Sequence, residues 1–158
     1  MLFRSPSRRP HRAADAVTAL LLSSAHRAQI ESEARSAFPR ECCGLLEGER
    51  EGDTIRVTAL HAARNLSTDS DRFEIDPAAH FAAIRIARAN GHEIVGCYHS
   101  HPNGGGEPSV RDGEGAWDEG FAWLIAAVSG TAVSVRGFVR AAAGWQPLEL
   151  QEVAEQAA

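Results

Sequence analysis

The chain contains no lysine, but it has sixteen arginines. This absence excludes Schiff-base chemistry, pyridoxal enzymes and the lysine of a phosphate-binding loop. Cysteine is scarce too: Cys42, Cys43 and Cys97 form no Cys-x-x-Cys pair, so neither a disulfide framework nor a cysteine-rich structural zinc site is predicted. Reduced thiols favour a cytoplasmic location. Any catalyst here must use carboxylates, imidazoles, hydroxyls, thiols or a metal.

Long apolar runs are also missing. No stretch approaches the ~20 residues that cross a bilayer, so we expect no membrane span. At 158 residues the chain has the length of one domain and is too short for an eightfold strand-helix barrel, which takes ~250 residues. The chain has twenty-one acidic residues and sixteen arginines, and four of the arginines lie in the first twelve residues. The rest of the chain is therefore acidic and is expected to bind nucleic acid poorly.

The ends of the chain differ from its body. Residues 1–15 are rich in arginine, and we interpret them as a disordered tail. A signal peptide is the alternative, but Asp15 interrupts an apolar segment that is already short. We assign residues 16–152 to a single domain and 153–158 to a C-terminal tail.

Hydrophobic patterns predict alternating strands and helices within the domain. Ser23-Ser24 is a candidate N-cap for a helix to about Phe38 with Ile30, Ala34 and Ala37 on its inner side. Asp76-Pro77 is typical of a second helix start; that helix reaches Asn90, with Phe81, Ile84, Ala87 and Arg88 bracketing its inner face. Strands are predicted at 16–22, 42–48, 54–62, 73–75, 93–100, 121–129, 132–140 and 145–150. The fold class is α/β, with a mixed sheet and two main helices.

The stretch HSHPNGGGEPSVRD, residues 99–112, carries the clearest chemistry. On an extended backbone His99 and His101 point to the same face, as ligands of a shared metal would. Ser109 and Asp112 are three residues apart, on one side of a short helix that begins at Pro108-Ser109. Two imidazoles and one carboxylate leave a tetrahedral zinc one open position for water, which is the ligand count of a catalytic site.

Simpler interpretations exist for parts of this pattern. Ser109-x-x-Asp112 is also similar to a helix capping box, and the glycines can form an ordinary turn. Cys42 or Cys43 could act as a thiol nucleophile with His99 as its base, although an apolar strand favours packing for both. His61, His80 and His92 have no carboxylate partner nearby in sequence and are interpreted as surface or packing residues.

Hydrolysis at a metal also needs an acid/base group. Glu41, between a predicted helix end and a buried strand, is the best candidate, although a glutamate at such a junction is more often a solvated charge.

The segments PRECCGLLEG (39–48), RN (64–65), FEIDP (73–77), HSHP (99–102) and PSVRD (108–112) occur in an order that resembles the JAMM metallopeptidases, also called the Mov34/MPN/PAD-1 family. The match covers roughly residues 24–140. The resemblance implies a curved mixed β-sheet flanked by helices, with cytidine-deaminase-like layering. It implies one zinc per chain bound by His99, His101 and Asp112. It further implies Glu41 as the general acid/base and Ser109 as a hydrogen-bond donor to the oxyanion.

The resemblance also implies a substrate. Family members cleave peptide or isopeptide bonds after the C-terminal Gly-Gly of ubiquitin or ubiquitin-like proteins, and the short bacterial members are associated with sulfur-carrier proteins, in some cases releasing cysteine. We therefore expect hydrolysis of a carrier-protein adduct, with the tail of the carrier pairing with a strand edge. A non-catalytic scaffold that binds ubiquitin-like proteins is the alternative, because the family includes members without the zinc ligands.

Overall fold

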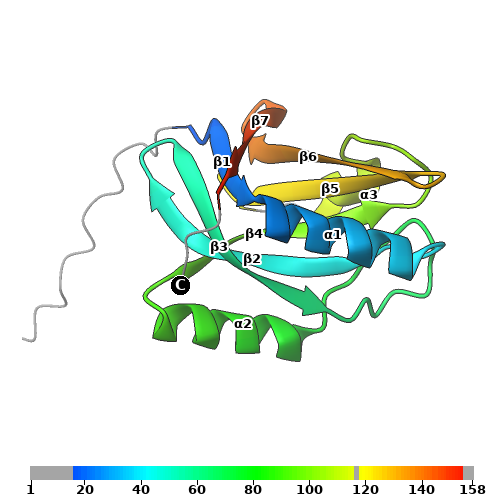
Figure 1. Ribbon diagram of the computed structural model, residues 1–158, viewed down its shortest axis with the longest axis horizontal. Helices are drawn as coiled ribbons and strands as arrows, with labels where there is room; N and C mark the ends of the chain where they lie inside the picture. Colours follow the sequence, from blue (N-terminus) through cyan, green and yellow to red (C-terminus); the bar gives the residue numbers. More distant parts are fainter. Residues whose placement is uncertain (1–15, 116–117, 155–158) are drawn as a thin grey trace, which may run out of the picture.

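The computed structural model describes residues 16–115 and 118–154. The tail predicted at 1–15 and most of that at 153–158 lie outside these residues. The described residues form seven strands and three helices, and Figure 1 shows how they are arranged. In chain order these are β1 (Ala19–Ser23), α1 (Ser24–Ala37), β2 (Cys43–Glu51), β3 (Thr54–Ala63), α2 (Pro77–Ala89), β4 (Glu93–His101), α3 (Val110–Gly115), β5 (Ala122–Ser129), β6 (Ala132–Ala141) and β7 (Gly144–Val153).

The strands form one mixed sheet that closes into a barrel in the order β1-β3-β2-β4-β5-β6-β7. Mixed pairing was expected, but closure was not, so the expected curved sheet flanked by helices is corrected to a closed barrel. The barrel closes because β1 pairs in parallel with both β3 and β7. β7 changes partner along its length: Gly144–Leu148 pairs with β6, and Glu149–Val153 pairs with β1. Val153, expected in the tail, is part of this strand.

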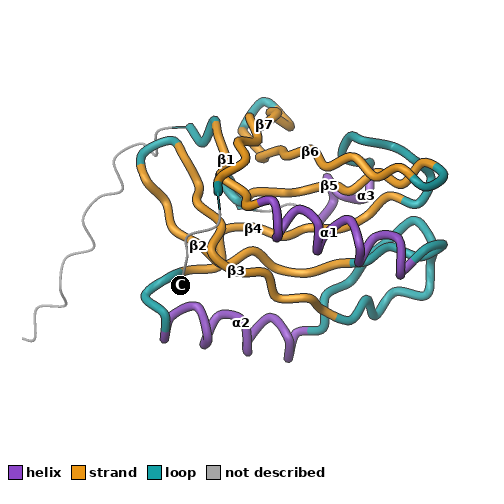
Figure 2. Tube along the Cα trace, viewed as in Figure 1, coloured by secondary structure: helices purple, strands orange, loops and turns teal. Residues whose placement is uncertain are grey.

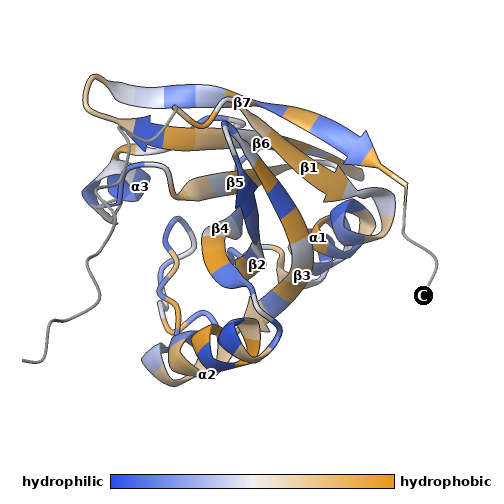
Figure 3. Cartoon of the chain, turned by 90° about the vertical axis from the view of Figure 1, so that its left-hand side faces the viewer, coloured by the Kyte–Doolittle hydropathy of each residue, from blue (hydrophilic) through white to orange (hydrophobic). Residues whose placement is uncertain are grey.

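Helix α1 forms as the sequence predicts. The Ser23 side chain caps it by accepting a hydrogen bond from the His26 amide at 3.0 Å. Ile30 and Ala34 are buried in the larger core cluster, together with residues from all seven strands. α2 lies on a different side of the sheet from α1 (Figure 3) and contacts β2, β3 and β4. None of the described helices is both long and apolar enough to cross a membrane.

The inner face of α2 differs from the prediction. Ala83 and Ala87 are buried and Ile84 is partly buried, whereas Phe81 is 70% exposed and Arg88 is exposed. The helix therefore packs through small side chains, which allow its backbone to approach the sheet closely. The size and apolar character of Phe81 therefore did not identify the buried side of this helix.

The strand predicted at 73–75 is also corrected. Only Ile75 makes a bridge, to Asn65, and residues 73 and 74 belong to no strand. This connection runs from the end of β3 to the start of α2.

Three connections meet at one end of the sheet. Cys43, at the start of β2, pairs with Ala63 at the end of β3 and with His99 near the end of β4. The loops that precede β2 and follow β3 and β4 therefore lie side by side (Figure 2). This end carries most of the residues that the sequence analysis singled out.

Candidate metal centre and active site

Strand β4 and helix α3 bring three candidate ligands together. His99 and His101 point to the same face of β4, with their Nε2 atoms 3.0 Å apart. Asp112, in the first turn of α3, places one carboxylate oxygen 3.1 Å from His99 Nε2 and the other 3.1 Å from His101 Nε2. All three side chains are buried. The structure thus brings together the residues predicted to bind metal.

The donor set fits zinc. Ligands bonded to a tetrahedral zinc at ~2.0–2.1 Å lie ~3.3 Å from one another, close to the spacing seen here. His101 Nδ1 lies 2.8 Å from the Gly105 carbonyl oxygen, which can accept a hydrogen bond but cannot donate one. The Nδ1 atom therefore carries the proton, and the Nε2 lone pair faces the centre.

The electrostatics favour the metal-binding forms of Asp112 and His99. Burial acts to raise the pKa of Asp112, but hydrogen bonds with His101 and His99 outweigh it and hold this pKa well below its usual value. Asp112 is therefore a carboxylate at neutral pH. Burial lowers the pKa of His99, which keeps its imidazole neutral. Burial also acts to lower the pKa of His101, but the hydrogen bond to Asp112 reverses the balance and raises it.

Glu41 lies beside this centre, just before β2. Its Oε1 is 3.7 Å from His101 Nε2, and the donor atoms of Glu41, His99 and His101 all lie within 4.8 Å of one another. Burial raises the pKa of Glu41 to about 7. Glu41 Oε2 is buried and makes no hydrogen bond to the described residues. A carboxyl group with these properties can both accept and donate a proton near neutral pH.

Ser109 has a helix-capping role in the structure. Its amide donates to Asp112 Oδ2 at 2.8 Å, and its Oγ accepts from the Asp112 amide at 3.1 Å. This reciprocal pair is a capping box, the simpler of the two interpretations that the sequence left open. The hydroxyl proton is still available, because Oγ only accepts in this pair. Ser109, Glu41 and His101 line the same cavity, of about 510 Å³.

Two aromatic residues complete the surroundings and were missed as site residues. The Phe73 ring stacks on His99 with centroids 4.4 Å apart and an interplanar angle of 23°. The Trp123 ring meets His99 edge-on at 5.7 Å. The sequence signal for Phe73 was the FEIDP segment, which contributed to the family resemblance and to a predicted strand, but no site role was assigned to Phe73 itself.

The cysteines and the remaining histidines considered in the sequence analysis do not belong to this centre. Cys42 and Cys43 are buried, and burial raises the pKa of their thiols to about 11 and about 12, so the thiol-nucleophile interpretation loses its basis. His61 and His92 do have a carboxylate partner: the two oxygens of buried Glu47 lie 2.7 Å and 2.9 Å from them. His61 and Glu47 pack in neighbouring strands although they are distant in sequence, and therefore sequence spacing did not reveal the pair. His80 lines a neighbouring groove and is not part of the centre.

Comparison with known proteins adds independent findings. Residues 23–141 match the family described as prokaryotic homologs of the JAB domain. The chain is 34% identical to a desampylase from Haloferax volcanii over 116 residues, 70% of this chain and 82% of that one. It is 37% identical to the histone deubiquitinase MYSM1 of Branchiostoma floridae over 74 residues, 46% of this chain but 9% of that protein. The solution structure of a protein from Desulfitobacterium hafniense matches with a TM-score of 0.79 and 29% identity, covering 86% of this chain and 94% of that one.

These findings agree with the order of motifs in the sequence and with the residues gathered at the end of β4. The family match spans the segment that contains Glu41, both histidines, Ser109 and Asp112. The resemblance stated from the sequence is confirmed: this chain belongs to the JAB domain family in its prokaryotic form, and thus to the JAMM proteins.

Proposed function

We propose that this protein is a zinc metallopeptidase that hydrolyses the peptide or isopeptide bond after the C-terminal Gly-Gly of a ubiquitin-like or sulfur-carrier protein. Release of an amino acid such as cysteine from the carrier is one form of this reaction. The observation that carries the proposal is the convergence of His99, His101 and Asp112 beside Glu41. The similarity to a desampylase and to a deubiquitinase supports hydrolysis of a protein conjugate.

The metal would be held by His99, His101 and Asp112, one ion per chain. When bound, zinc lowers the pKa of a coordinated water to about 7 and polarises a carbonyl group. Glu41 lies outside this set of three, because its nearest approach to His101 Nε2 is 3.7 Å, against 3.1 Å for Asp112.

Glu41 would act as the general base and then as the general acid. With a pKa of about 7, its carboxylate takes the proton of the attacking water and passes it to the leaving amine. The unpartnered Oε2 offers the acceptor for that proton. Ser109 would donate a hydrogen bond from its hydroxyl group to the oxyanion that develops on the substrate carbonyl. The capping pair with Asp112 fixes the Ser109 backbone and leaves the hydroxyl proton unused.

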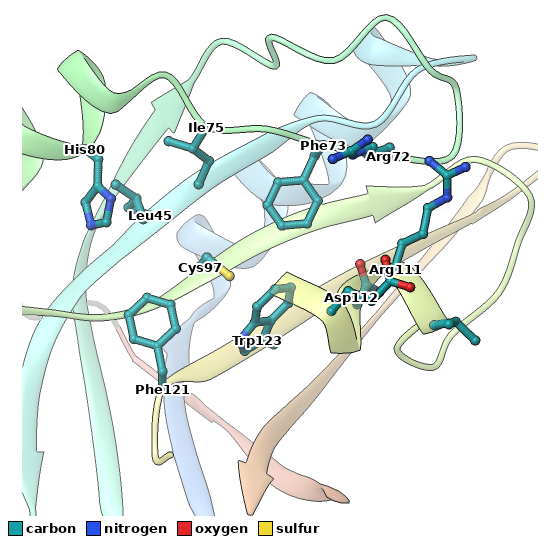
Figure 4. Close-up of a pocket in the computed structure, with 12 residues that line it drawn as sticks. Leu45, Arg72, Phe73, Ile75, His80, Cys97, Arg111, Asp112, Phe121 and Trp123 are labelled. Carbon is teal, nitrogen blue, oxygen red and sulfur yellow. The ribbon is translucent and has the colours of Figure 1, made fainter. Parts of the chain in front are cut away.

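A groove of about 820 Å³ next to the centre suits an extended peptide tail. Figure 4 shows Asp112, Arg72 and Arg111 at one end, Phe73, Cys97 and Trp123 along its length, and His80 and Phe121 at the other end. A mostly apolar groove with charges at the end next to the ligands can seat the side chains of a tail and deliver its last residues to the centre.

The strand edge with which this tail was expected to pair is not that of β4. β4 carries the histidines, but it is paired on one side with β2 and on the other with β5, so it offers no free edge beside the site. We therefore place the tail in the groove between the 72–75 segment and β5.

Zinc content and hydrolysis measured together test this function. The substrate is a carrier protein bearing a Gly-Gly-linked amino acid, and the proteins are wild type, Glu41→Gln and Glu47→Gln. Glu47 is the matched control, because it is also a buried glutamate but bonds His61 and His92 outside the centre. We expect about one zinc per chain in all three proteins, with cleavage by wild type and Glu47→Gln only. A chelator should abolish cleavage and iodoacetamide should not.

The scaffold alternative predicts a different result. If wild type binds zinc and leaves every Gly-Gly adduct intact, the hydrolase proposal fails and the binding role gains support. A cytoplasmic location is also a proposal; it accords with Cys42, Cys43 and Cys97, which are all free and buried.

A further inference from the structure

Asn65 has no part in the proposed chemistry, yet its side chain makes four hydrogen bonds. The amide nitrogen donates to the Glu41 carbonyl oxygen at 3.0 Å and to the Arg72 carbonyl oxygen at 3.1 Å. The amide oxygen accepts from the Ser67 amide at 2.9 Å and from the Glu74 amide at 3.0 Å. A carboxamide has two donor hydrogens and two acceptor lone pairs, so Asn65 uses all of its capacity.

The contact between the segments at 40–41 and 65–67 is reciprocal. Asn65 donates from its side chain to the backbone of Glu41, and Arg40 donates from its guanidinium to the carbonyl oxygens of Ser67 and Asn65. Each segment thus holds the backbone of the other. The far side of Glu41 is fixed as well, since the Cys42 amide donates to Ser100 Oγ at 2.7 Å.

The side-chain amide of Asn65 also fixes the position of Phe73. Arg72 and Glu74, its neighbours in the chain, are both bonded to Asn65. The Phe73 ring lies on His99 at a centroid distance of 4.4 Å. One side chain therefore ties the backbone of the candidate acid/base to the segment that packs on a candidate ligand.

We propose that Asn65 is a positioning residue, which holds Glu41 beside His101 through its bond to the Glu41 carbonyl oxygen and seats Phe73 on His99 by ordering residues 72–74. The inference rests on the proposed function in naming Glu41 as the group whose position matters. It also gives a reason why Asn65 and the 73–77 segment are among the segments that resemble the family, beside those that carry the ligands.

Two substitutions separate the donor bonds of Asn65 from its acceptor bonds. Asn65→Asp keeps an oxygen for the Ser67 and Glu74 amides but turns a second oxygen toward two carbonyl oxygens, so the bond to Glu41 is lost. Asn65→Ala loses all four bonds. Asn90→Ala is the matched control, because it removes an amide that donates to Glu47 at 2.9 Å, away from the centre.

We expect Asn65→Asp to keep its zinc and its KM while kcat falls by roughly 10- to 100-fold, the scale of an acid/base group displaced by ~1 Å. Asn90→Ala should lower stability and leave kcat unchanged. Wild-type kcat in folded Asn65→Asp would overturn the proposal, since a purely structural asparagine affects stability alone.

Crystals of the same variants give a readout that needs no activity. In Asn65→Asp the distance from Glu41 Oε1 to His101 Nε2, 3.7 Å in this structure, should lengthen by about 1 Å. In Asn65→Ala the Phe73 ring should also leave His99. If wild type cleaves no carrier, the proposed function falls while the crystals still decide the role of Asn65. Glu41 at its wild-type position in both variants refutes that role.

Discussion

At the scale of single residues, the burial of Glu41 favours proton transfer but lowers the stability of the fold. Burial raises its pKa to about 7, which suits proton transfer near neutral pH. The same burial disfavours the ionised form in the folded protein. A carboxyl group with a raised pKa destabilises the fold once pH exceeds its unfolded value of 4.5.

The sign of this effect gives a prediction. Between pH 4.5 and about 7 the folded chain holds a proton that the unfolded chain has released, so the free energy of unfolding falls as pH rises. Without metal, Glu41→Gln should therefore be more stable than wild type near pH 8, by up to about 3 kcal/mol. The difference should nearly vanish below about pH 5. Urea unfolding of chelator-treated proteins measures it, and a more stable wild type at the higher pH would contradict the burial argument.

At the scale of elements, α2 shows how a helix can face a sheet through alanine. Ala83 and Ala87 are 2% and 0% exposed, while the larger Phe81 points to solvent. Small residues at the contact allow α2 to lie close to β2 and β4, and this in turn fixes where the 64–76 connection ends, at the start of α2.

Enlarging the contact should therefore cost more than enlarging the surface. We expect Ala83→Leu to lower the free energy of unfolding by about 1–3 kcal/mol, because extra methylene groups have no space there. Ala82→Leu, one residue earlier and exposed, should change it by less than ~0.5 kcal/mol. Denaturant unfolding of both variants checks this, and equal costs would mean that the helix is free to shift outward.

At the scale of the whole molecule, β1 joins the two ends of the sheet. It pairs with β3 at Ala19–Leu21 and with β7 at Ala19–Ser23, so the barrel closes through a contact between the beginning and the end of the described chain. This closure removes two free edges, which would otherwise be open to pairing with other chains.

Removing the part of β7 that pairs with β1 should open the barrel. We expect deletion of residues 149–158 to lower Tm by several degrees or more and to promote association of the exposed edges. Deletion of 154–158 alone should have no such effect, because the pairing ends at Val153. Thermal unfolding and light scattering compare the two. Unchanged stability of the longer deletion would show that closure contributes little.

The sequence by itself determined the local features and was enough to propose the chemistry. Ser23 and Asp76 cap their helices as predicted, because a cap depends on side chains within a few residues. His99 and His101 share a face because alternation along a strand is a local rule. The candidate ligands, the acid/base candidate and the family were therefore all accessible from short segments whose residue types and spacings have few other uses.

Tertiary structure alone decided what depends on contacts between distant segments. The barrel closure, the exposed position of Phe81, the stacking of Phe73 on His99 and the pairing of Glu47 with His61 and His92 all join residues that sequence spacing does not connect. Asn65 belongs to the same group, since its four partners lie between two and twenty-four positions away. Burial is likewise a property of the assembled fold, and it is burial that raises the pKa of Glu41 into the range useful for proton transfer.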